Sequence, residues 1–259
     1  MKIYDCFIFN HEVELLELRL NILNDYVDKF VITEGNVTFR GLPKESYFLK
    51  NKERFAQWED KIILNSITIP ECESPWDREI YSRNSMIDLD IFEDGDLILT
   101  SDTDEIPNPE VLEHASEWIK DDSHFTFQQS CYAYWVNNLC SDKWFGTRAA
   151  TYKYIKNVGV DEIREVTEDE SKITGSVITN GGWHFTSLGD ADHIKQKIKS
   201  FSHSVMDVPE VIENISKNLE EGKDVFNRSH ITCHRVDIDD SFPQYIIDNQ
   251  ETYSHLIKD

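Results

Sequence analysis

The stretch GDLILTSDTDEIPNP, residues 95–109, decides how this chain is interpreted. Its run Leu-Ile-Leu-Thr at 97–100 is typical of a buried strand. Directly behind that run stand three carboxylates in four positions, Asp102, Asp104 and Glu105. Negative charge gathered at the tip of an apolar strand needs a compensating partner. That partner is either water or a cation.

Strands and helices alternate on the amino-terminal side of this stretch. The patterns predict strands at 3–9, 29–33 and 61–67, and helices at 12–23, 53–59 and 76–92. Another helix at 109–120 follows, with Asn108 as its N-cap and Pro109 at its first position. This alternation predicts an α/β, Rossmann-like fold: a mostly parallel sheet with helices on both faces. Ligands bind such sheets at the carboxyl ends of the strands, which is where Asp102 and Asp104 stand.

The carboxyl-terminal half has weaker patterns. They predict an aromatic-rich strand at 124–136, strands and loops over 140–190, a helix at 192–205 and one or two docked helices in the tail. No repeat, low-complexity segment or linker divides the chain. We therefore expect one domain spanning residues 1–259.

Composition narrows the class of protein. The 259 residues include 39% hydrophobic and 12% aromatic side chains, enough for a real core. The formal net charge of −23 argues against nonspecific binding to nucleic acid or anionic membranes, because both require a basic surface. The sequence has no long apolar run typical of a signal peptide or a membrane span, so we expect a cytoplasmic protein. Its five scattered cysteines, without a CxxC pair, favour buried thiols in a reducing compartment over a disulfide framework.

The acidic strand end has three chemical interpretations. Alternate residues of an extended chain share a face, so Asp102 and Asp104 can present two carboxylates to one Mg²⁺ or Mn²⁺ ion. A solvated loop with a helix-capping aspartate is the simpler alternative. A phosphohydrolase with Asp102 as nucleophile is a third. An EF-hand is excluded, because Ile106 and Pro107 stand where that loop needs an oxygen ligand and a glycine.

Several segments together resemble glycosyltransferase family 17. They are DCFIFNHEVELLELRLNIL, FVITEGNVTFRGLPK, GDLILTSDTDEIPNPEVL, GGWHF and the terminal PQYIIDNQETYSHLI. The resemblance covers most of the chain and implies a GT-A-type fold, with residues 1–122 as the nucleotide-sugar-binding half and 123–259 as the acceptor-side half and C-terminal helices. It also implies inverting transfer, in the manner of β-1,4-mannosyl-glycoprotein N-acetylglucosaminyltransferases, of GlcNAc from UDP-GlcNAc with Mn²⁺ or Mg²⁺ to a glycan hydroxyl. The animal members look like membrane-anchored Golgi proteins, so this chain is more similar to a bacterial or viral relative.

The implied chemistry assigns a metal site. A divalent ion on Asp104 would stabilise the departing diphosphate, while Asp102 binds the metal, a metal-bound water or the ribose. We expect His184 of the GGWHF segment as the next ligand, with Trp183 beside it as a wall for a sugar. His203 is the second candidate, and the simpler alternative for His184 is a structural role.

The nucleotide is expected at the carboxyl ends of the first two strands. The candidates for nucleotide binding are Phe9, Asn10, Glu12, Thr33, Glu34, Arg83 and Asp102. Glu34 and Arg83 also fit an ordinary loop carboxylate and a surface ion pair. Lys195, Lys197 and Lys199 form a small basic cluster, for which a solvated helix face is the simpler interpretation.

An inverting transfer needs a general base for the acceptor hydroxyl. The candidates are Asp161, Glu162 and Glu165 of the segment GVDEIRE, and Glu105 beside the metal pair, and of these we favour Asp161 or Glu162. The cluster His230-x-x-Cys233-His234 lacks a second half-site for zinc, so we expect it to be structural. A non-catalytic carbohydrate-binding protein is a further alternative, with stacking residues Tyr132, Tyr134, Trp135 and Trp144.

Overall fold

The computed structural model describes residues 1–164, 173–221, 223–228 and 231–258. Its strands are β1 (Ile3–Ile8), β2 (Lys29–Gly35), β3 (Ile62–Ile67), β4 (Leu97–Asp102), β5 (Glu105–Pro107), β6 (His124–Ala133), β7 (Asn138–Thr151), β8 (Ser176–Thr186) and β9 (His234–Arg235). Its α-helices are α1 (Val13–Leu23), α2 (Tyr47–Lys50), α3 (Pro75–Asn84), α4 (Pro109–Leu112), α5 (Ala115–Trp118), α6 (Tyr152–Val158), α7 (Val160–Ile163), α8 (Ala191–Ser200), α9 (Pro209–Glu220) and α10 (Gln244–Asp248). Short 3₁₀ helices are η1 (Lys52–Trp58), η2 (Ser85–Ile87), η4 (Ser204–Met206) and η5 (Ser254–Leu256).

All the strands of the described residues belong to one sheet, in the order β3-β2-β1-β4-β7-β6-β8-β5, with β9 paired to β7. The first four strands in this order are mutually parallel. β7 then runs antiparallel to β4, so the parallel core continues into a mixed half. Asp102 ends β4 opposite Ile8 of β1, which places the acidic loop at the carboxyl end of the parallel core.

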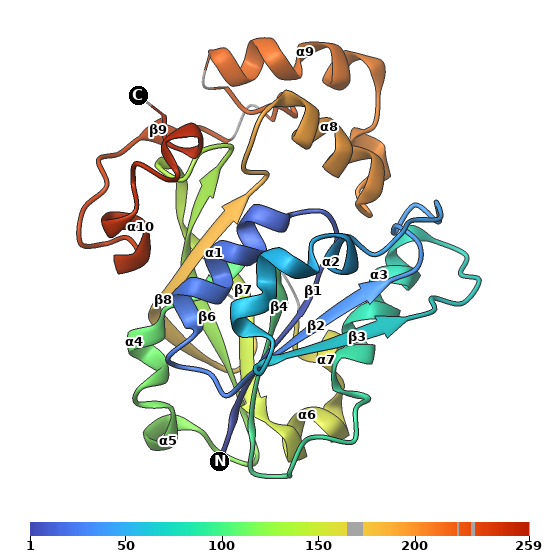
Figure 1. Ribbon diagram of the computed structural model, residues 1–259, viewed down its shortest axis with the longest axis vertical. Helices are drawn as coiled ribbons and strands as arrows, with labels where there is room; N and C mark the ends of the chain where they lie inside the picture. The colour runs from blue at the N-terminus through green and yellow to red at the C-terminus, as the bar shows by residue number, and fades with distance from the viewer. Residues whose placement is uncertain (165–172, 222, 229–230, 259) are drawn as a thin grey trace.

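Helices cover both faces of the parallel core, as the alternation of apolar residues predicts. On one face, Leu16 and Leu20 of α1 pack with Phe7 of β1. On the other, residues of η2, α6 and α7 form a second cluster that includes Cys6. Figure 1 shows α1 crossing the sheet. The α/β fold class is therefore confirmed.

A third apolar cluster joins α8 and α9 to the end of β6. Figure 1 places this pair of helices at the end of the molecule opposite the amino terminus. Ile194 and Ile198 of α8 are fully buried in this cluster, so they anchor the helix that carries Lys197. No helix of the described residues is long and apolar enough to cross a membrane.

Several local predictions were wrong. The helix expected at 109–120 is two short helices, α4 and α5, because the backbone of His114 leaves the helical conformation. The segment 140–190 contains α6 and α7 as well as strands, and α9 was not predicted at all. Cysteine usage was also misjudged: Cys140 of β7 and Cys233, which precedes β9, form a disulfide.

Candidate active site

A buried arginine fixes the backbone of the acidic loop. Arg19 of α1 donates hydrogen bonds to the carbonyl oxygens of Asp102, Thr103 and Glu105 at 3.0, 3.2 and 2.8 Å. Asp5, in the middle of β1, holds the same guanidinium through both carboxylate oxygens, at 2.8 and 2.6 Å. Both side chains are fully buried. Their signal in the sequence is a charged residue inside an apolar stretch, Asp5 in YDCFIF and Arg19 in LLELRLNIL, and the sequence analysis did not use it.

Glu105 is the most enclosed carboxylate of the loop. Arg164 donates to its two oxygens at 2.7 and 2.8 Å, and the indole nitrogen of Trp144 donates at 2.9 Å. Burial alone would raise the pKa of Glu105, but Arg164 lowers it to about 2. A Cβ added at Gly146 would lie 2.3 Å from the Glu105 carboxylate, so only glycine permits this approach. Glu105 thus has no oxygen directed at a substrate, and a structural role fits it better than that of the base.

Asp102 is the more accessible aspartate of the loop. Its side chain is 31% exposed and accepts a hydrogen bond from Arg164 at 2.8 Å. Arg83 of α3 approaches both its oxygens at 3.3 Å. Two guanidinium groups therefore compensate the charge of Asp102, while about a third of its side chain remains exposed to solvent.

Asp104 is buried and faces two cationic groups. Lys197 of α8 donates to Oδ2 at 2.7 Å, and Nε2 of His184 lies 3.5 Å from Oδ1. Burial by itself would raise the pKa of Asp104, but Lys197 and His184 hold it well below its ordinary value. The carboxylate is thus ionised whenever the protein is folded near neutral pH. The negative charge of Asp104 is therefore already compensated by Lys197 and His184, and a metal ion would have to compete with them for it.

His184 is positioned by the sheet. It pairs in register with Glu105 across β8 and β5, and its ring stacks on Trp144 with centroids 4.2 Å apart. Its Nδ1 lies 3.5 Å from the sulfur of Cys131. Burial lowers the pKa of His184, but Cys131 and Asp104 outweigh it and raise the pKa to about 10. Trp183 points elsewhere: its indole is buried and donates to the Ser241 carbonyl, so Trp144, not Trp183, lies beside His184.

The family model for glycosyltransferase family 17 matches residues 1–258. The chain belongs to glycosyltransferase family 17. It is therefore a glycosyltransferase, as the resemblance of its motifs indicated. No curated protein matches the chain.

Solved structures give distant likenesses. The chain is similar to residues 1–349 of TarS from S. aureus, with 10% identity, a TM-score of 0.42, and coverage of 82% of this chain and 69% of that one. It is also similar to HddC from Yersinia pseudotuberculosis, with 10% identity, a TM-score of 0.39, and coverage of 71% and 91%. At these identities and TM-scores the likenesses bear on neither the substrate nor the roles of residues.

In this family 17 chain, a small hollow opens at the carboxyl ends of β1 and β2. Phe9, Asn10 and Thr33 line it together with Lys44 and Ser82. Three of the expected nucleotide contacts are thus brought together. Phe9 is itself buried in the core, so little of it is accessible to a ligand.

Glu34 and Glu12, the two glutamates expected to bind the nucleotide, have different surroundings. Glu34 accepts hydrogen bonds from Lys44 and from the backbone nitrogen of Tyr47, each at 2.7 Å, and from Ser46. Its carboxylate is therefore used to hold the start of α2. Glu12, in contrast, lies within the site, with Oε1 3.9 Å from Nζ of Lys197.

Arg83 links Asp102 to one candidate base. Its guanidinium pairs with Glu79 on its own helix, reaches Asp102, and lies 3.8 Å from Oδ1 of Asp161 in α7. The Asp161 side chain is 32% exposed, so it lies beside the acidic loop and remains accessible. Glu162, the next residue, is exposed to solvent and shares no contact with this cluster among the described residues. Glu165, a further candidate base, lies outside the described residues.

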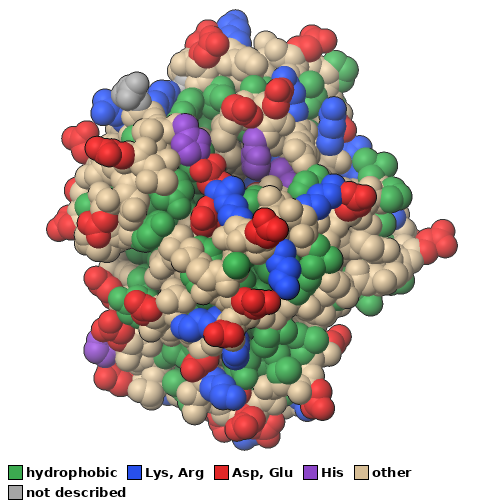
Figure 2. Space-filling model, in the orientation of Figure 1, with side chains coloured by type: hydrophobic (Ala, Val, Ile, Leu, Met, Phe, Trp, Pro, Cys, Tyr) green, Lys and Arg blue, Asp and Glu red, His purple; other side chains and the backbone are tan. Residues whose placement is uncertain are grey.

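The remaining candidates divide clearly. Lys197 is turned inward to Asp104, contrary to the solvated face expected for its cluster, whereas Lys195 pairs with Asp192 on the surface and Lys199 is exposed. His203 packs edge-on against Trp76, with centroids 4.8 Å apart. His230 lies outside the described residues, so the structural role expected for the His230–Cys233–His234 cluster stays a prediction. Figure 2 shows histidine, basic and acidic side chains gathered on the face below α8 and α9.

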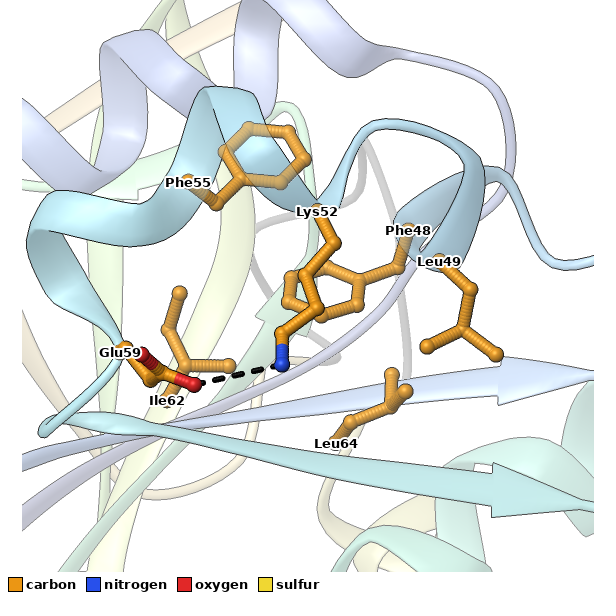
Figure 3. Close-up of a pocket in the computed structure, with 7 residues that line it drawn as sticks. All are labelled: Phe48, Leu49, Lys52, Phe55, Glu59, Ile62 and Leu64. Carbon is orange, nitrogen blue, oxygen red and sulfur yellow. Dashed lines mark ion pairs between the residues drawn. The ribbon is translucent and has the colours of Figure 1, made fainter.

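An apolar hollow of about 220 Å³ lies away from these groups, between η1 and the edge strand β3. Figure 3 shows its lining and the ion pair of Lys52 with Glu59 at 3.2 Å. Its lining residues are Phe48, Leu49, Lys52, Phe55, Glu59, Ile62 and Leu64, none of which belongs to the acidic loop. It therefore has no part in the candidate active site.

The residues at the acidic loop fit a metal ion only in part. Asp104 and His184 present one oxygen and one nitrogen 3.5 Å apart, and both donor types bind Mn²⁺ in proteins, the imidazole only after it has released its proton. Among residues 1–164 and the later described segments, no group of three or more His, Cys, Asp or Glu side chains converges on one point. The two groups fit a site that the oxygens of a diphosphate complete, which is a common arrangement for hard divalent ions.

Proposed function

We propose that this family 17 protein is an inverting, metal-dependent glycosyltransferase that transfers GlcNAc from UDP-GlcNAc to a hydroxyl of a glycan. The observation that carries the proposal is the buried, ionised carboxylate of Asp104, which faces His184 at the carboxyl end of the parallel core. Asn10 and Thr33, two of the expected nucleotide contacts, line a hollow of about 20 Å³ at the carboxyl ends of the same parallel strands, where ligands bind such sheets.

Each part of the site then has a task. A Mn²⁺ or Mg²⁺ ion on Asp104 and His184 would supply Lewis-acid stabilisation of the leaving diphosphate. Arg83 and Arg164 hold Asp102 in place beside it. Trp144, stacked on His184, gives this part of the site an aromatic wall.

Asp161 is our candidate for the general base. In the transfer, the acceptor oxygen forms a bond to the anomeric carbon while the bond from that carbon to the phosphate oxygen breaks. The acceptor proton passes to the Asp161 carboxylate, and UDP leaves with the electron pair. Asp161 is preferred to Glu105, whose oxygens are bound by Arg164 and Trp144, and to Glu162, which faces solvent.

A thermal-shift screen of nucleotides and nucleotide-sugars, with and without Mn²⁺, tests the proposal. A ligand that binds only the folded protein raises its melting temperature. We expect UDP and UDP-GlcNAc to stabilise the protein only when Mn²⁺ is present, and Asp104→Ala to abolish that effect. Lys199→Met, on the exposed face of α8, is the control and should behave as wild type. Stabilisation by GDP- or CMP-sugars instead would disprove the donor, and metal-independent stabilisation by UDP would disprove the metal.

A further inference from the structure

Lys197 already occupies the carboxylate on which the proposed metal depends. Its ammonium lies 2.7 Å from Oδ2 of Asp104 and 3.9 Å from Oε1 of Glu12. The side chain is only 16% exposed. The helix that carries it, α8, is anchored by Ile194 and Ile198, which are fully buried in the cluster shared with α9. The contact is therefore built into the fold.

An ammonium and a divalent ion cannot share Asp104 without cost. Two cations separated by a few ångströms in a partly buried site repel each other strongly, since little water screens them. Metal entry therefore requires the ammonium to withdraw. Glu12 is the second carboxylate near this ammonium. Burial would raise the pKa of Glu12, but His11 and Lys197 outweigh burial and lower that pKa. It is thus ionised and able to receive the displaced ammonium.

We propose that Lys197 competes with the divalent ion for Asp104, withdraws towards Glu12 when the ion binds, and then contacts the diphosphate of the donor. The inference rests on the proposed metal-dependent function. It makes metal and donor binding interdependent, because the diphosphate carries the negative charge that lets both cations remain in one site. Mn²⁺ alone then binds weakly, and UDP tightens it.

Two quantities test the competition: the Kd of Mn²⁺ alone, and the factor by which saturating UDP lowers that Kd. Both can be measured from the electron paramagnetic resonance signal of free Mn²⁺. Lys197→Met removes the competing charge at nearly constant length. In the wild type, Mn²⁺ must break the charge-assisted hydrogen bond from Lys197 to Asp104, and the variant removes that cost. We therefore expect Mn²⁺ alone to bind roughly tenfold or more tightly to the variant, and the factor by which UDP lowers the Kd of Mn²⁺ to fall by a similar amount.

Three further variants serve as controls. Lys199→Met removes the same charge from an exposed position of α8 and should leave both quantities within about twofold of wild type. Lys197→Arg keeps the charge and should not tighten Mn²⁺ binding. Glu12→Gln removes the second seat of the ammonium, so Lys197 stays on Asp104 and Mn²⁺ alone should bind more weakly.

The outcomes separate this inference from the proposed function. If wild type binds Mn²⁺ and UDP together, but Lys197→Met leaves either quantity unchanged, the competition is disproved while the metal-dependent function stands. If wild type binds no Mn²⁺ with or without UDP, both fail. Should Lys197→Met not fold, as judged by circular dichroism, Glu12→Gln decides, and unchanged Mn²⁺ affinity in that variant overturns the inference.

Discussion

Arg19 and Asp5 form a fully buried bidentate ion pair that ties helix α1 to strand β1, and the same guanidinium holds three carbonyl oxygens of the acidic loop. Both side chains are fully buried, so neither is accessible to a substrate. The guanidinium of Arg19 has five N–H donors, and these hydrogen-bond to Asp5, to the carbonyl oxygens of the loop and to the hydroxyl of Ser101. The shape of the acidic loop therefore depends on a residue outside the loop.

Substitution of Arg19 should be severely destabilising. Arg19→Met leaves Asp5 charged and buried without a partner, and we expect a loss of about 3–5 kcal/mol in the free energy of unfolding. Urea denaturation measures it. The double variant Asp5→Leu/Arg19→Met removes both charges and should be more stable than Arg19→Met alone. Lys50→Met, which removes an exposed ion pair with Glu45, is the control and should unfold like wild type. Equal stabilities of the single and double variants would contradict a buried-charge effect.

Local pattern predicted the strands and helices that position the acidic loop, because each pattern depends on neighbouring residues. The links between the loop and the rest of the chain were not predicted. Arg164 reaches Glu105 across 59 positions and Lys197 reaches Asp104 across 93. No local periodicity records such pairings. The helix pattern does not give the direction of Lys197 either, because Lys195 flanks the buried face of α8 at a similar angle and yet pairs with Asp192 on the surface.

Glu105 should make stability depend on pH in the acid range. Its pKa is lowered to about 2 in the folded protein, so its stabilising contribution is complete above the unfolded pKa of about 4.5 and is lost as pH falls through about 2. The shift corresponds to about 3 kcal/mol. We expect the metal-free wild-type protein to lose stability steeply between these pH values, and Glu105→Gln to be less stable at neutral pH but to show a shallower slope. Glu162→Gln should follow wild type. Parallel curves for Glu105→Gln and wild type would refute the assignment.

The disulfide predicts a definite thiol count. Cys140 and Cys233 are bonded, while Cys6, Cys72 and Cys131 are free, so the denatured, unreduced protein should react with three equivalents of a thiol reagent. The bond closes a loop of 93 residues, and Cys140→Ser/Cys233→Ser should lower stability by roughly 2–4 kcal/mol. Cys72→Ser serves as a control that leaves the bond intact. Five reactive thiols in protein purified without reductant would show that the bond does not form.

Asp161 should affect the chemical step more than substrate binding. If its carboxylate accepts the acceptor proton, Asp161→Asn lowers kcat roughly a hundredfold or more with little change in the KM of either substrate. Its neighbour Glu162 is exposed and supplies the matched control, since Glu162→Gln makes the same change in charge one position away. Because Asp161 also lies 3.8 Å from Arg83, a merely structural role would act through Asp102 and raise the KM for the donor. Steady-state kinetics with UDP-GlcNAc and Mn²⁺ distinguish the two roles, and a rise in KM at unchanged kcat would exclude Asp161 as the base.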